Sequence, residues 1–128
     1  MMKRYDPLTP PDPEQWQSLD EQEQIQLVED YHRRARIGLP NLKVHAIFHV
    51  IVEKQILLGD ETPVRRTVQR LMSEGLDRHD AIHAVGSVLA AHVHDLVTGP
   101  QSKSGEDPNR PYYAALDKLT AEEWLRSS

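Results

Sequence analysis

The chain has 128 residues, the length of a single domain whose apolar core is large enough to fold without disulfides. It contains no cysteine, which excludes disulfides, cysteine nucleophiles, thiolate zinc sites and iron–sulfur clusters, and favours a reducing cytoplasm. The formal net charge is −5, from 15 basic and 20 acidic residues, so we expect no nucleic-acid partner, and no uncharged stretch is long enough to cross a membrane.

The N-terminal part is predicted to hold an arm and two helices. Residues 1–11 are rich in proline and are expected to form an extended arm, and Asp12 followed by Pro13 is typical of a helix start. A second helix is predicted to start near Asp20, because apolar residues then recur at helical spacing. It is expected to end at the glycine–leucine–proline sequence of residues 38–40.

Residues 41–58 are predicted to form the central helix. Asn41 is suited to cap its start, and Gly59 to end it. Apolar side chains point in almost every direction around its axis, and only Lys43 and Lys54 mark a clearly polar side. A helix that is apolar nearly all round is expected to be buried.

Two further helices follow the central one. Pro63 is typical of the start of a short helix, and Gly75 of its end. Asp77 is suited to cap a longer helix over 77–98, which has one apolar stripe.

The remaining residues are predicted to form a polar loop over 101–110 and two short helices over 112–119 and 120–126. No alternation of period two indicates a strand. The predicted fold class is therefore all-α: a compact single-domain bundle of residues 1–128, with about four main helices, short terminal helices and a histidine-bearing core at 41–98.

Histidines on the two most apolar helices carry the strongest chemical signal. The chain has seven histidines. His45, His49 and Glu53 are spaced four residues apart, which places them on one stripe of the central helix. His79 and His83 repeat this spacing on the helix over 77–98.

These five residues are the predicted metal ligands, because helix bundles build metal sites from side chains that project inward from facing helices. Imidazole and carboxylate ligands suit zinc, iron, manganese, nickel or cobalt. Glu53 would be a fifth ligand or would hold one imidazole in place. An open coordination position would allow hydrolytic or redox chemistry, whereas a closed shell would make the ion a structural clamp.

A metal-free alternative fits the same residues. Glu53 could accept hydrogen bonds from two buried histidines, which would form a His–Glu network within a helical interaction module. The apolar helix over 41–58 would then serve an interface, so a homo-oligomer stays open. The sequence does not decide whether the protein is an enzyme, and it assigns no substrate.

The other three histidines are predicted to be peripheral. His32 is expected at the surface near a helix C-terminus, where a cation is favoured. His92 is expected to be exposed or in a contact. His94 is nearer the His83 side than His92 is, and could be an outer partner of the site.

The stretch from His45 to Gln55 and the pair His79 and His83 resemble a family of small bacterial proteins known only as a domain of unknown function. That family carries His-x3-His-x3-Glu-x-Gln on one helix and His-x-Ala-x-His on a later one, and the likeness covers roughly residues 41–97. It brings no established activity and implies only that these residues belong together.

A fainter likeness is to hemerythrin-type bundles. His49-x3-Glu53 and His79-x3-His83 are similar to two iron-ligand motifs of those proteins. The downstream His-x4-Asp element of that family is absent, because Asp95 directly follows a histidine.

Overall fold

The computed structural model describes residues 4–38, 41–99 and 106–127. Within these ranges it has helices and no strand, which confirms the predicted all-α class. In chain order the elements are α1 (Pro13–Gln17), α2 (Glu21–Arg34), α3 (Leu42–Leu57), the 3₁₀ turn η1 (Gly59–Glu61), α4 (Val64–Ser73), α5 (Arg78–Thr98), α6 (Arg110–Lys118) and α7 (Ala121–Ser127).

Side-chain caps determine where the first helices and α5 begin. The Asp12 carboxylate accepts a hydrogen bond from the backbone N–H of Gln15, the third residue of α1, and Asn41 and Asp77 cap the third residues of α3 and α5 in the same way. Asp20 and Glu23 form a reciprocal capping box at the start of α2. The predicted starts of α1, α2, α3 and α5 are therefore confirmed.

The end of α2 differs from the prediction. The helix ends at Arg34, and Arg36 adopts the left-handed conformation with φ of 58°. The backbone N–H of Ile37 then bonds to the carbonyl of His32, which closes a Schellman motif. The predicted stop at 38–40 falls partly on residues 39–40, outside the described residues, as do residues 101–105 of the predicted polar loop.

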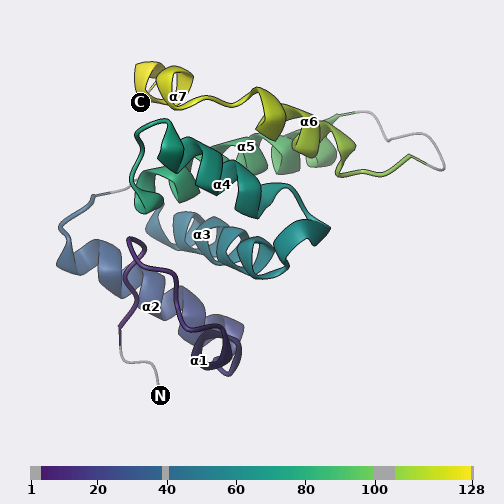
Figure 1. The fold of residues 1–128 in the computed structure, drawn as a ribbon. Coiled ribbons are helices and arrows are strands. Elements are labelled where there is room, and N and C mark those ends of the chain that lie inside the picture. The colour runs from purple at the N-terminus through teal and green to yellow at the C-terminus, as the bar shows by residue number, and fades with distance from the viewer. Residues whose placement is uncertain (1–3, 39–40, 100–105, 128) are drawn as a thin grey trace.

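Helix α3 lies between α2 on one side and α4 and α5 on the other (Figure 1). One apolar cluster joins α3 to α4, α5 and α6 and includes Val52, Leu71 and Ile82. A second cluster joins α3 to the N-terminal segment, α1 and α2, and includes Ala46. The prediction of a central helix is thus confirmed, although Val44 remains 43% exposed.

The N-terminal segment before α1 packs against the bundle. The ring of Tyr5 is fully buried in the second cluster, 5.2 Å from the ring of Trp16. The guanidinium of Arg34 donates to the Tyr5 carbonyl, and that of Arg78 donates to the Pro7 carbonyl. The segment is therefore held to both α2 and α5.

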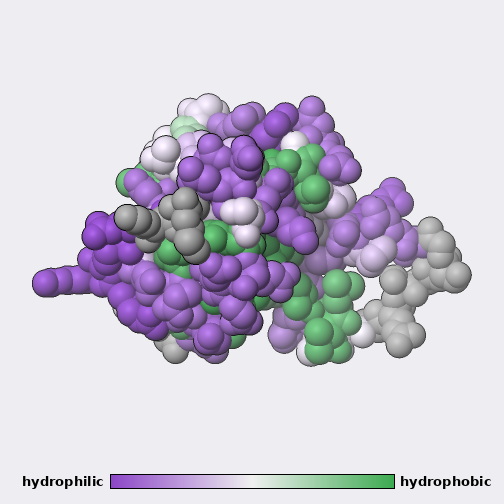
Figure 2. Space-filling model, turned by 90° about the horizontal axis from the view of Figure 1, so that it is seen from below, coloured by the Kyte–Doolittle hydropathy of each residue, from purple (hydrophilic) through white to green (hydrophobic). Residues whose placement is uncertain are grey.

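The face of the molecule seen from below is mostly hydrophilic, with apolar side chains reaching it in places (Figure 2). Large exposed apolar residues include Val44 on α3 and Leu96 and Val97 on α5. None of the described helices is long and apolar enough to cross a membrane.

Candidate metal centre

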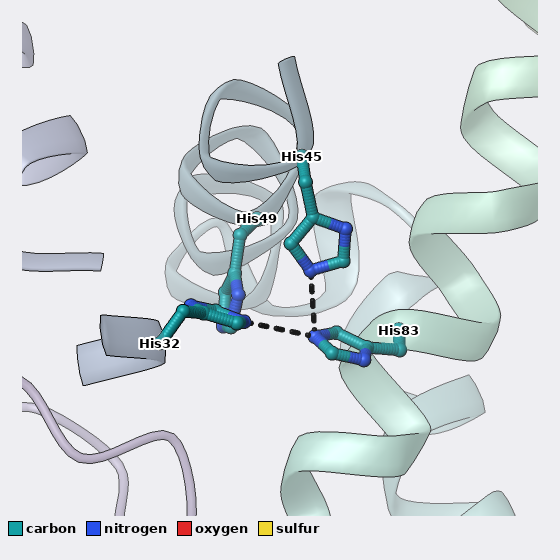
Figure 3. A group of neighbouring side chains, drawn as sticks. All are labelled: His32, His45, His49 and His83. Carbon is teal, nitrogen blue, oxygen red and sulfur yellow. Dashed lines mark hydrogen bonds between the residues drawn. The ribbon is translucent and has the colours of Figure 1, made fainter. Parts of the chain in front are cut away.

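Four histidines from three helices point toward one another in the interior of the bundle (Figure 3). They are His32 on α2, His45 and His49 on α3, and His83 on α5. Each offers one ring nitrogen, and these four atoms all lie within 4.8 Å of one another. His32 and His49 are buried, whereas His45 and His83 are partly exposed and form the outer side of the group.

The spacing of the ring nitrogens is close to that of a tetrahedral metal site. The Nε2 atoms of His45 and His83 are 2.8 Å apart, and those of His32 and His83 are 3.5 Å apart. Zinc–nitrogen bonds of about 2.0–2.1 Å place tetrahedral ligand nitrogens about 3.3 Å apart. An ion would therefore separate the first pair slightly and bring the most distant nitrogens closer together by up to about 1.5 Å.

The backbone of α2 orients the His32 ring. Its Nδ1 lies 2.8 Å from the Val28 carbonyl oxygen, one helical turn earlier. A carbonyl only accepts, so Nδ1 carries the proton and Nε2 keeps its lone pair toward His83. A histidine ligand held in this way by a carbonyl is the usual arrangement around protein metal ions.

The ring of His49 is hydrogen-bonded to the N-terminal segment through its Nε2 atom. The Tyr5 hydroxyl lies 2.7 Å from Nε2 of His49 and also bonds to the Glu53 carboxylate. The Nδ1 atom of His49 is buried and has no hydrogen-bond partner among the described residues. One nitrogen of this ring is thus free for an ion.

Glu53, a predicted ligand, lies outside the four-nitrogen group. Its two carboxylate oxygens accept from the two terminal nitrogens of Arg78 at 2.8 and 2.7 Å. Both side chains are buried, with 1% and 5% exposure. The carboxylate therefore neutralises Arg78 and reaches the histidines only through Tyr5.

His79, also a predicted ligand, is a fifth ring beside the group. Its centroid lies 4.0 Å from that of His83 and 5.6 Å from that of His49. Its Nε2 atom is buried and has no partner among the described residues. The structure thus brings together His45, His49 and His83 of the predicted set and places His79 at their edge.

The grouped rings are held in the neutral form. Burial, with smaller contributions from neighbouring histidines, lowers the pKa of His83 to about 2 and that of His45 to about 4. Burial also lowers the pKa of His32, and that of His49 lies well below its ordinary value for the same reason. Neutral imidazole is the form that a metal ion requires.

His32 is the ligand candidate that the sequence analysis placed wrongly. It was expected at the surface as a cation, but its side chain is fully buried and its pKa is lowered. The signal was the spacing of four residues from Val28, which puts both on the buried face of α2. The arm residue Tyr5 had no comparable signal, because no helical period applies there.

The remaining two histidines lie away from the group. His92 is buried and stacks on Tyr112 with ring centroids 5.5 Å apart, so its predicted contact is confirmed. His94 was expected as an outer partner of the site, but its side chain is 74% exposed and lies beside Asp95. Its position on α5 turns it outward, so that prediction is wrong.

No protein-family model, curated protein or solved structure matches this chain. The two resemblances described above therefore stay predictions. The candidate metal site is therefore defined by the geometry of the four histidines.

Proposed function

We propose that the protein binds one transition metal ion through His32, His45, His49 and His83. The observation that carries the proposal is the convergence of four neutral ring nitrogens from α2, α3 and α5 within 4.8 Å. Two of the rings, His32 and His49, have one nitrogen bonded away from the group. This is how histidine ligands are commonly oriented.

The ligand set narrows the choice of ion. Four imidazoles without a carboxylate suit borderline ions such as zinc, cobalt, nickel or iron, whereas manganese and magnesium favour oxygen ligands. Glu53 does not alter this, because it is paired with Arg78.

The number of ligands favours a structural role. Four protein ligands fill a tetrahedral shell, and closed shells are typical of structural zinc sites, whereas catalytic zinc sites keep one position open. The ion would tie α2 to α3 and α5 at the partly exposed side of the cluster formed by His45 and His83. A substrate is not required for this role.

The test is metal analysis of protein purified without a histidine tag, before and after loading with zinc or cobalt. We expect one ion per chain, tetrahedral cobalt absorption and a raised melting temperature that a chelator reverses. A variant with His32, His45 and His83 all changed to alanine should bind none. The matched control is His94→Ala, which removes an exposed histidine from α5 and should bind as the natural chain does.

A second candidate is a metal-free helical interaction module. It is favoured by the hydrogen bond between His45 and His83, and by the bonds of Tyr5 to His49 and Glu53, which join the helices without an ion. The exposed apolar residues of α3 would then contact a second copy of the chain. This function predicts no metal after loading with any of these ions, and a dimer in sedimentation.

A further inference from the structure

The hydrogen bonds around Tyr5 have a defined direction. Glu53 receives two bonds from the Arg78 guanidinium, which marks it as an ionised carboxylate that only accepts. The Tyr5 hydroxyl must therefore donate its single proton to Glu53. Its oxygen is left to accept, and the remaining neighbour is Nε2 of His49 at 2.7 Å.

This direction determines the tautomer of His49. Nε2 carries the ring proton, because it donates to the Tyr5 oxygen, and Nδ1 keeps the lone pair. The same Nδ1 is the buried nitrogen that lacks a partner among the described residues. His32 shows the opposite arrangement, with Nδ1 bonded to the Val28 carbonyl and Nε2 facing His83.

We propose that Tyr5 is a positioning residue of the metal site, which holds His49 as an Nδ1 ligand while His32, His45 and His83 bind through Nε2. The inference rests on the proposed metal-binding function. It makes the N-terminal segment part of the site, although Tyr5 itself does not touch the ion.

The surroundings of Tyr5 support this role. Its side chain is fully buried, and its ring lies edge-on to that of His49 at 5.2 Å. The backbone at Tyr5 and two residues after it is held by Arg34 and Arg78, which donate to the carbonyls of Tyr5 and Pro7. The hydroxyl is thereby kept in place between His49 and Glu53 rather than free to rotate away.

The first test uses the natural chain. In metal-free protein labelled with nitrogen-15 in histidine, long-range proton–nitrogen spectra should show His49 as the Nε2–H tautomer. In the cadmium-loaded protein, nitrogen–cadmium coupling should appear on Nδ1 of His49 and on Nε2 of the other three ligands. Coupling on Nε2 of His49 would overturn the role of Tyr5 and leave the proposed function standing.

The second test is Tyr5→Phe, which keeps the ring and removes the hydroxyl. We expect zinc affinity to fall by about 10–100-fold, the usual effect of losing a group that orients a ligand. The His49 tautomer should become mixed in the metal-free variant. The matched control is Tyr31→Phe, whose ring lies 6.4 Å from that of Tyr5, and its zinc affinity should be unchanged.

Two further results would overturn the inference. One is a folded Tyr5→Phe variant, checked by circular dichroism, with natural zinc affinity and an unchanged His49 tautomer. The other is an Nδ1–H tautomer of His49 in the metal-free natural chain, which needs no variant. If no metal binds to any of the proteins, the proposed function itself has failed.

Discussion

The two halves of helix α3 bury polar side chains in opposite ways. Toward its C-terminus, Glu53 forms two hydrogen bonds with Arg78 and a third with Tyr5, so that its charge is fully paired. Toward its N-terminus, His45 and His49 face other histidines, and no cation or carboxylate directly contacts their grouped nitrogens among the described residues. His45, His49 and Glu53 are spaced four residues apart, so the same spacing yields both the histidine group and the paired carboxylate.

The difference shows what distinguishes a structural ion pair from a binding site. Buried polar groups in proteins are normally hydrogen-bonded, and those without partners require an explanation. Both carboxylate oxygens of Glu53 are hydrogen-bonded, whereas His49, one of the four grouped histidines, has a buried Nδ1 atom with no partner among the described residues. A ligand is therefore expected at the histidines and not at the carboxylate.

The largest effect is expected from Glu53→Ala. It leaves the buried Arg78 guanidinium unpaired, and breaking a buried pair in this way costs about 3–5 kcal/mol of unfolding free energy. Urea denaturation of the metal-free protein measures it. The control is Glu122→Ala, which removes an exposed i, i+4 pair with Arg126 and should have little effect. Equal losses in the two variants would contradict the distinction between the halves of α3.

The next largest effect is expected on the stabilisation that bound zinc gives to the fold, and it distinguishes the histidines that bind the ion from those that do not. At a free zinc concentration 100 times Kd, bound metal stabilises the fold by about 2.7 kcal/mol. We expect His32→Ala to abolish this stabilisation and His79→Ala to retain most of it, because only His32 belongs to the four-nitrogen group. Titration with zinc, followed by thermal unfolding, separates them. The reverse order would mean that the sequence-based set is the real ligand set.

The sequence was sufficient to predict the all-α class, the capped starts of α1, α2, α3 and α5, and three of the four grouped histidines. Caps such as Asp20 and Asn41 act locally, so helix starts could be predicted, and spacing of four residues placed His45 and His49 on one face. The role of Glu53 could not be predicted, because its partner Arg78 is 25 residues away and long-range pairs leave no periodic signal.

The same limit applies to Tyr5 and His32, which reach the site from separate segments. Tyr5 lies 44 residues from His49, in a segment without helical period. His32 lies 51 residues from His83, and its position near a predicted helix C-terminus suggested an exposed cation. Packing of α2 against α3 decided the outcome instead.

A smaller effect is expected from pH on the metal-free protein. The pKa values of His45 and His79 are lowered to about 4 by burial, so between pH 6.5 and 4 the unfolded chain binds protons that the folded chain does not. Stability should therefore rise with pH across this window and level off above it. Each such histidine contributes at most about 1.4 kcal/mol per pH unit.

Urea denaturation at pH 7, 6 and 5 measures this dependence, and the variant lacking His32, His45 and His83 should show a smaller slope. Stability that increases as the pH falls from 7 to 5 would mean that the grouped rings are protonated in the fold. That result would remove the distinction between a neutral histidine cluster and the charged pair of Glu53 and Arg78.

The smallest effect is expected from Gln55→Ala. Gln55 belongs to the His-x3-His-x3-Glu-x-Gln pattern, yet its side-chain oxygen accepts a hydrogen bond from the Tyr112 hydroxyl at 2.8 Å on α6. Loss of one neutral, partly buried bond costs about 1 kcal/mol. We expect that loss in urea denaturation, with zinc affinity unchanged. A fall in zinc affinity would instead show that the end of α3 is coupled to the histidines, and that its two halves act as one unit.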